Sequence, residues 1–148
     1  MATNSITIDA PVERVYAVLA DGRSYAEWVV GAKRIRKVDP DWPAIGSKFH
    51  HRVGAGPITI DDESEVLDVE PRQRLKLRVR ARPAGEAHVT LTLAATNGGS
   101  ATNVEMEEHP VRGFATVVGR NPIADWLLAR RNDEALRRLK NRAEGGHA

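Results

Sequence analysis

The stretch NPIADWLLARRNDEALRRLKNRA, residues 121–143, decides the fold. It predicts one long helix, because Asn121 can cap it, Pro122 suits its first position and Gly145-Gly146 ends it. Apolar residues recur at helical spacing along one side: Ile123, Leu127 or Leu128, Ala135 and Leu139. A helix with one apolar side needs a large apolar surface to cover that side. The preceding residues must supply this surface.

Those preceding residues alternate apolar and polar side chains with period two, which is typical of half-buried antiparallel strands. Strands are expected at residues 5–8, 33–38, 48–53, 58–69, 75–81, 89–93 and 102–108, with turns at 54–57, 70–73, 83–85 and 97–99. A bulge near residues 66–69 would let the longest strand bend. Residues 109–120 are less regular, with Pro110, Gly113 and Gly119, and form a candidate lid or loop.

Two short helices are expected after the first strand. Asp9 can cap the first one and Pro11 falls in its opening turn. Its apolar stripe has helical spacing and consists of Val12, Val15, Tyr16 and Leu19. Asp21-Gly22 stops this helix, and residues 24–28 predict one further helical turn.

This order of elements predicts an α+β fold in which the long helix lies in a bent antiparallel sheet. Such a packing tends to leave a gap between sheet and helix, and a gap of this kind can hold a ligand. At 148 residues the chain is expected to be one domain, residues 1–148, with a single core.

Composition excludes several classes of protein. Hydrophobic residues make up 41% and charged residues 28%, as in ordinary globular proteins. No apolar run approaches the roughly 20 residues that span a bilayer, and the N-terminus lacks a secretory signal, so a cytoplasmic location is expected. The absence of cysteine excludes disulfides, thiolate metal sites and a cysteine nucleophile.

The charge is nearly balanced, with 22 basic and 20 acidic residues and a net charge of +2. So small a charge argues against a protein that grips a phosphate backbone, and no nucleic-acid partner is expected. Basic clusters do occur, one at Lys76, Arg78, Arg80 and Arg82 and one between Arg130 and Arg142. The favoured interpretation is solvated strand and helix faces; contact with nucleic acid or anionic lipid is the alternative.

Four short motifs carry a resemblance to a known family. They are IDAPVERVY at residues 8–16, Trp28 at the end of the second helix, Val69-Glu70-Pro71 at a strand end, and RNxxALxxLK at residues 131–140. With the order of elements, they make the chain resemble the START-like SRPBCC superfamily, closest to its polyketide cyclase/dehydrase branch. The resemblance implies a helix-grip fold: a seven-stranded curved antiparallel sheet wrapped around the long C-terminal helix, with a deep cavity between them.

Members of that superfamily carry lipids, sterols, plant hormones or polyketides, and a minority catalyse cyclisation or dehydration. The resemblance therefore implies a small hydrophobic ligand but transfers no catalytic motif. Three hypotheses follow: a carrier of a lipid, sterol-like or aromatic polyketide ligand; a polyketide cyclase or dehydratase; and a regulatory module whose loop at residues 111–119 closes over the ligand.

Strand phase points two titratable residues, His51 and Asp62, toward the cavity. If the turn at 54–57 is tight, Val53 lies opposite Ile58, and His51 lies diagonal to Asp62 at roughly 7–8 Å. A carboxylate beside an imidazole holds its tautomer and raises its basicity, as acid–base catalysis on a carbonyl compound requires. We therefore predict His51 and Asp62 as the catalytic pair. Pocket lining without chemistry, or neither role, stays open.

Other polar residues share the inward phase. Glu108 follows Val104 and Met106, and Arg112 or His109 could pair with its carboxylate. Asn132 falls in the apolar stripe of the long helix and could bond a ligand or the strand backbone. The full set of candidate ligand-binding residues is Tyr25, Trp28, Phe49, Ile60, Leu77, Leu91, Met106, Glu108, Phe114, Trp126 and Asn132.

No cofactor and no metal site are predicted. His50 and His51 are adjacent on a strand and point to opposite faces, so they cannot chelate one ion together. The sequence contains no phosphate-binding glycine loop and no nucleotide fingerprint. The expected partner is a small hydrophobic ligand, with no stable membrane insertion. The oligomeric state stays open, a homodimer among the options.

Overall fold

The structure is a computed structural model that describes residues 2–29, 32–55, 58–81, 85–112 and 122–145. Its elements in chain order are β1 (Ala2–Ile8), α1 (Val12–Leu19), the short 3₁₀ turn η1 (Gly22–Ser24), α2 (Tyr25–Trp28), β2 (Ala32–Val38), β3 (Lys48–Ala55), β4 (Ile58–Glu70), β5 (Arg74–Ala81), β6 (Gly85–Thr96), the 3₁₀ turn η2 (Asn97–Gly99), β7 (Ala101–Arg112) and α4 (Pro122–Gly145). No described helix has the length and apolar character needed to cross a membrane.

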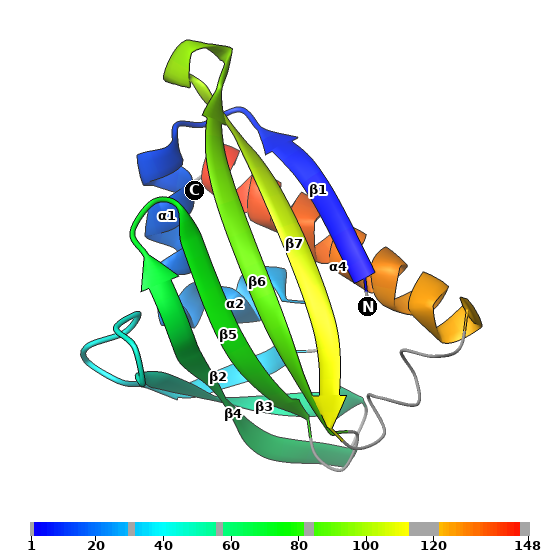
Figure 1. Cartoon of the computed structure of the whole chain (residues 1–148). Helices are drawn as coiled ribbons and strands as arrows, with labels where there is room; N and C mark the ends of the chain where they lie inside the picture. Colours follow the sequence, from blue (N-terminus) through cyan, green and yellow to red (C-terminus); the bar gives the residue numbers. More distant parts are fainter. Residues whose placement is uncertain (1, 30–31, 56–57, 82–84, 113–121, 146–148) are drawn as a thin grey trace.

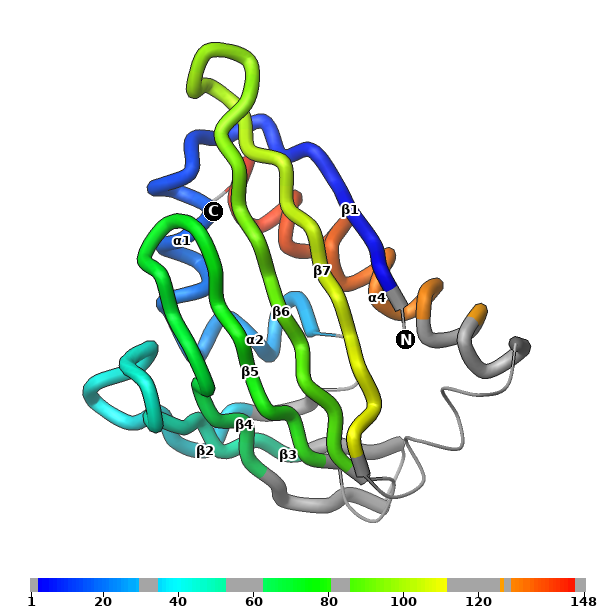
Figure 2. The backbone as a smooth tube through the Cα atoms, viewed as in Figure 1, coloured from blue at the N-terminus to red at the C-terminus, as the bar shows by residue number. Residues whose placement is uncertain are grey.

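The seven strands form one antiparallel sheet in the order β1-β7-β6-β5-β4-β3-β2. The sheet curves, and α4 runs along one of its sides next to β1, while α1 and α2 lie near the C-terminal end of α4 (Figure 1). The tube in Figure 2 follows the same path and shows β2 crossing the direction of β5, β6 and β7, while the second half of β4 runs beside β5. The predicted α+β helix-grip fold is confirmed. We call the side of the sheet turned toward α4 its inner face.

Several strands are longer than their apolar alternation predicts. β1 begins at Ala2 instead of residue 5, and β3 continues through Ala55. β7 continues through Arg112, so residues 109–112 are strand and not loop. Backbone pairing with a neighbouring strand extends these elements beyond the side-chain pattern, because each ladder bond satisfies another buried polar group. Residues 113–120 of the predicted lid lie outside the described residues.

The register of the β3–β4 hairpin differs from the prediction. Ala55 pairs with Ile58, Val53 with Ile60 and His51 directly with Asp62. The prediction that Val53 lies opposite Ile58 is therefore wrong. The ladder continues to the pair Ala55–Ile58, so it includes two of the four residues, 54–57, that were expected to form the turn. The predicted bulge is confirmed, since the β4–β5 register shifts between Val66 and Asp68.

The predicted cap of α1 is also wrong. Pro11 is the N-cap, with no side-chain cap, and α1 begins at Val12. Asp9 instead donates its backbone N–H to Glu144 Oε2 at 2.7 Å, which ties the chain entering α1 to the end of α4. The turn at 97–99 follows the sequence, because Asn97, Gly98 and Gly99 all have positive φ, a region that asparagine and glycine tolerate.

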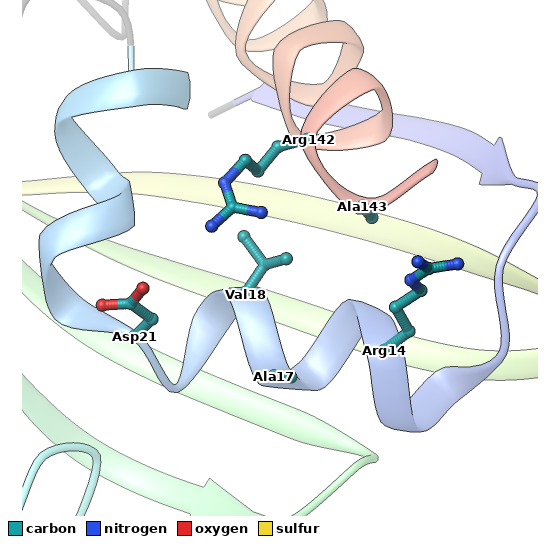
Figure 3. Close-up of a pocket in the computed structure, with 6 residues that line it drawn as sticks. All are labelled: Arg14, Ala17, Val18, Asp21, Arg142 and Ala143. Atoms are coloured by element: carbon teal, nitrogen blue, oxygen red, sulfur yellow. The ribbon is translucent and has the colours of Figure 1, made fainter. Parts of the chain in front are cut away.

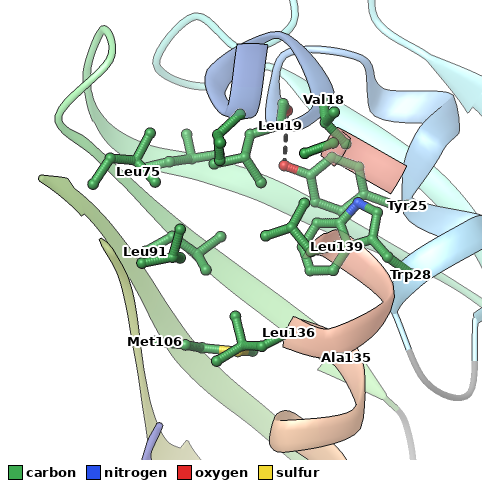
Figure 4. Close-up of a cluster of buried hydrophobic side chains, with 14 of the residues drawn as sticks. Val18, Leu19, Tyr25, Trp28, Leu75, Leu91, Met106, Ala135, Leu136 and Leu139 are labelled. Carbon is green, nitrogen blue, oxygen red and sulfur yellow. Dashed lines mark hydrogen bonds between the residues drawn. The ribbon is translucent and has the colours of Figure 1, made fainter. Parts of the chain in front are cut away.

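The core lies between the inner face, α1, α2 and the C-terminal half of α4. Figure 4 shows Leu75, Leu91 and Met106 from the sheet facing Leu136 and Leu139 of α4. Leu136 and Leu139 are fully buried, and Ala135 is 4% exposed, so the apolar stripe of the long helix is confirmed where its side chains are described.

Candidate functional site

Four buried polar side chains belong to the inner face or to the side of α4 that faces it. They are His51 of β3, Ser64 of β4, Glu108 of β7 and Asn132 of α4, each no more than 8% exposed. Other buried hydroxyls serve the backbone: Ser24 donates to the Val18 carbonyl, and Thr102 to the Ala10 carbonyl. The four bond to side chains on other elements instead. Polar groups placed this way in an apolar wall mark a candidate ligand site.

The first polar group on the inner face is the His51–Ser64 pair. His51 Nε2 lies 3.3 Å from Ser64 Oγ, and the imidazole ring centroid lies 5.3 Å from that of Phe49. Which atom carries the proton depends on the imidazole tautomer. Asp62 occupies the register position opposite His51, but its side chain is outside the described residues. A neutral imidazole beside a hydroxyl can accept a proton and return it, which is the requirement for general acid–base work.

The second polar group is the Glu108 cluster, consisting of Glu108, Arg131 and Asn132. Arg131 Nη2 donates to both carboxylate oxygens of Glu108, at 3.0 and 3.2 Å, and Asn132 Nδ2 donates to Oε1 at 3.0 Å. Of the two predicted partners, His109 instead lies 3.5 Å from Glu107 Oε2, and the side chain of Arg112 is outside the described residues. Both of its described partners come from α4, which packs beside β1, the strand paired with β7. The cluster thus joins helix and sheet by charge-assisted hydrogen bonds.

The predicted aromatic residues Tyr25, Trp28 and Phe49 gather in an aromatic cluster with Trp42. The Tyr25 ring lies 4.7 Å from Trp28 and 4.8 Å from Phe49, centroid to centroid. The Tyr25 hydroxyl donates to the Leu19 carbonyl at 2.8 Å, as Figure 4 shows, and burial raises its pKa well above the ordinary value. Trp42 Nε1 also donates to the Leu19 carbonyl. The polar tips are satisfied within the protein, which favours a core role.

The remaining predicted residues divide into three groups. Leu77, Leu91 and Met106 lie buried on the inner face, as their phase predicts. Trp126 does not join them, because its side chain is 56% exposed. The side chain of Ile60 and the whole of Phe114 lie outside the described residues.

Two residues of the site were not among the predicted site residues. Ser64 lies two residues after Asp62 on the same strand, so the sequence predicts that it too points inward. A single serine, however, gave no reason to select it as a site residue. Arg131 precedes Asn132 in a run of charged residues that predicted a solvated helix face. Its side chain is indeed 47% exposed, yet its guanidinium reaches the buried Glu108.

Among the described residues, no group of three or more histidine, aspartate or glutamate side chains is placed to hold a metal ion. The described residues do form a surface pocket of about 210 Å³ where α1 meets the end of α4. Figure 3 shows Arg14 of α1 and Arg142 of α4 on either side of Val18 there. Arg142 Nε also donates to Glu27 Oε2 at 2.6 Å. None of the four buried polar residues of the inner face and α4 lines this pocket.

A family model described as polyketide cyclase / dehydrase and lipid transport matches residues 2–144. The chain belongs to this family. The match agrees with the resemblance to the polyketide cyclase/dehydrase branch of the SRPBCC superfamily. No curated protein sequence matches the chain significantly.

Solved structures share the fold of this family member. The Zhui aromatase/cyclase from Streptomyces sp. R1128 superposes with a TM-score of 0.73 at 18% identity, covering 99% of this chain and 94% of that one. The di-domain ARO/CYC StfQ of the steffimycin biosynthetic pathway gives 0.72 at 16% identity, covering 99% of this chain and 46% of that one. A Deinococcus radiodurans protein gives 0.67 at 18% identity, with 98% of each chain covered. At such low identities the likeness concerns the fold alone.

Proposed function

We propose that the protein binds and carries a small hydrophobic ligand, of the lipid, sterol-like or aromatic polyketide class, between the inner face of the sheet and α4. The observation that carries this proposal is the pair of polar groups, His51–Ser64 and the Glu108 cluster, set into an otherwise apolar wall. A core formed only for stability gains little from such groups, because burying them costs free energy that their mutual bonds merely offset. A ligand site uses them to orient its ligand.

The apolar residues of the inner face supply the affinity in this account. Leu77, Leu91 and Met106 lie on three adjacent strands between the two polar groups. Apolar surface removed from water contributes roughly 25 cal/mol per Å², so a ligand of sterol size gains most of its binding free energy from this wall. The description of the family, which includes lipid transport, supports the same ligand class.

The test is a fluorescence titration with N-phenylnaphthylamine, an uncharged apolar probe, followed by competition with a lipid extract. We expect saturable binding that the extract displaces. His51→Ala should leave the affinity within a few-fold, since apolar burial dominates, and Ile45→Ala, at a 64% exposed position, serves as a control. Probe binding that neither saturates nor responds to the extract contradicts the carrier function.

A second candidate function is a cyclase or dehydratase, favoured by the contact between His51 and Ser64. In this reaction His51 Nε2 removes a proton from the carbon next to a ketone, giving an enolate. The imidazolium then protonates the β-hydroxyl, which leaves as water while the carbon–carbon double bond forms. Asp62 is the predicted residue that orients the imidazole, since its backbone pairs directly with that of His51.

The two functions separate on one variant. Under the catalytic hypothesis, His51→Ala abolishes the loss of water from a bound β-hydroxyketone, followed by mass spectrometry, while probe affinity persists. A variant that retains full turnover excludes His51 as the base. A wild-type protein that binds such ketones without converting them leaves the carrier function standing and contradicts the enzyme.

A further inference from the structure

The outer side of α4 carries an exposed aromatic and cationic pair. The side chain of Trp126 is 56% exposed, and the guanidinium carbon of Arg130 lies 4.9 Å from the centroid of its ring. The two residues are one helical turn apart, so the stack forms within a single element. We call it the Trp126–Arg130 pair.

Trp126 differs from the other two tryptophans of the chain. Trp28 is 2% exposed and Trp42 is 8% exposed, and each indole N–H donates to a group inside the protein. Indole is a large apolar body with one polar tip, and water solvates it poorly. Tryptophan is enriched where one side is apolar and the other wet, both at protein interfaces and at the surface of a bilayer.

Arg130 also differs from the other basic residues of α4 in the kind of group that its side chain contacts. The other basic side chains of α4 each meet a carboxylate: Arg131 with Glu108, Arg137 with Asp133, Arg138 with Glu134, Lys140 with Glu144 and Arg142 with Glu27. Within the described part of the chain, the contact of Arg130 is the ring of Trp126. Its positive charge therefore remains available to an anionic partner, and guanidinium suits phosphate well.

The pair lies on the same turns of α4 that hold the candidate site. The Ala129 carbonyl accepts a bond from Asn4 Nδ2 at 2.9 Å, which fixes this part of the helix to β1. Asn132, two residues after Arg130, points to the opposite side and bonds Glu108. A surface bound to the pair would thus lie one helix diameter from the Glu108 cluster.

We propose that the protein docks on anionic lipid bilayers through Trp126 and Arg130, with the indole among the headgroups and the guanidinium on lipid phosphate. A second copy of the chain fits the pair less well. One tryptophan side chain buries at most roughly 250 Å², while a stable protein interface buries roughly 1,000 Å² or more. A bilayer can take up a single indole without a matching surface. Docking is independent of the proposed ligand function and can fail while that function holds.

The test uses the intrinsic fluorescence of Trp126 and vesicles of brominated phosphatidylcholine with phosphatidylglycerol. Trp28 and Trp42 are buried, so bromine quenching at the membrane surface reports Trp126. We expect quenching and co-sedimentation at low salt that weaken as salt rises. Arg130→Gln should lower vesicle affinity about fivefold, the equivalent of about 1 kcal/mol per basic residue. Trp126→Ala should lower affinity on the order of tenfold, measured by co-sedimentation.

Matched controls are available at other exposed positions. Arg14→Gln removes an exposed cation of α1, and Ile45→Ala removes an exposed apolar side chain of the loop before β3. Both variants should bind vesicles as the wild type does, and N-phenylnaphthylamine titration should show an unchanged inner face in all four variants. Wild-type protein that neither sediments with anionic vesicles nor shows quenching overturns the proposal. So does binding that survives both substitutions, or a dimer that buries Trp126 in the absence of lipid.

Discussion

The aromatic cluster and the polar groups of the inner face are both buried, but they satisfy their polar atoms differently. Tyr25, Trp28 and Trp42 donate to groups within the chain's own first 25 residues, and their rings pack on one another. His51 and Glu108 bond to side chains of other elements instead. The aromatic cluster needs no ligand to satisfy its polar atoms. His51 and Glu108 place polar side chains in an apolar wall, where a ligand could replace their present partners. Stability and recognition thus depend on different parts of the same interior.

The largest effect should come from breaking the aromatic cluster. Trp28→Ala removes a side chain that is 2% exposed and packed between Tyr25 and α4, so the free energy of unfolding should fall by about 3–5 kcal/mol. Urea unfolding measures it. Ile45→Ala, at an exposed position, should change stability by less than about 0.5 kcal/mol. A loss no larger than that control would remove the distinction between the two regions.

The next effect concerns the Glu108 cluster. Glu108→Leu leaves the Asn132 amide buried without its partner, which should cost about 1–3 kcal/mol. Adding Asn132→Leu to Glu108→Leu should recover part of that loss, because both polar partners are then gone. A double-mutant cycle in urea gives the coupling free energy. Strictly additive losses would mean that the hydrogen bond contributes nothing.

A smaller effect is expected at the His51–Ser64 pair. Ser64→Ala removes one buried hydrogen bond and should cost about 1 kcal/mol, without disturbing the aromatic cluster beside it. Near-ultraviolet circular dichroism of the tryptophans should stay unchanged while the chemical shifts of the His51 ring move. If the tryptophan signal collapses as well, the two regions form one packing unit and the comparison fails.

The smallest effect is electrostatic and lies on the outer face of the sheet. Partial burial, and then Lys76, Arg78 and His109 outweighing Glu86, hold the pKa of His88 below its ordinary value. Because the folded-state pKa lies below the unfolded one, the contribution of His88 to stability is complete above about pH 6.5. It is lost as pH falls through the lowered pKa. His88→Asn should therefore flatten the decline in thermal stability between neutral and mildly acidic pH. Identical slopes for the two proteins would refute this role.

Much of the fold was predictable because period and turn chemistry are local. The alternation along β5, β6 and β7, the glycines of η2 and the stripe of α4 each predicted the element that the structure contains. Ladder lengths were not predictable, since pairing extended β1 and β7 beyond their side-chain pattern. Asp9 failed as a cap because its N–H bonds to Glu144, which is 135 residues away.

For the candidate site, strand phase predicted which residues lie on the inner face of the sheet but not which side chains contact one another. Phase placed His51, Met106 and Glu108 on the inner face, and the structure agrees. Phase could not reveal that Arg131 crosses from the helix to Glu108, because that contact depends on where α4 lies over the sheet. The exposure of Trp126, in contrast, could have been predicted from helical phase. Trp126 precedes Asn132 by six residues, which places it about 120° away around the helix axis and outside the side that Asn132 turns inward.

The most direct test of ligand binding on the inner face uses the two methionines of the chain, Met1 and Met106. Protein with ¹³C-labelled methionine methyl groups is titrated with N-phenylnaphthylamine, and the Trp28 and Trp42 indole N–H signals are followed in the same samples. We expect a saturable shift of the Met106 methyl signal with little change in the indole signals. Probe binding that saturates while Met106 stays unmoved would contradict a ligand site between the sheet and α4.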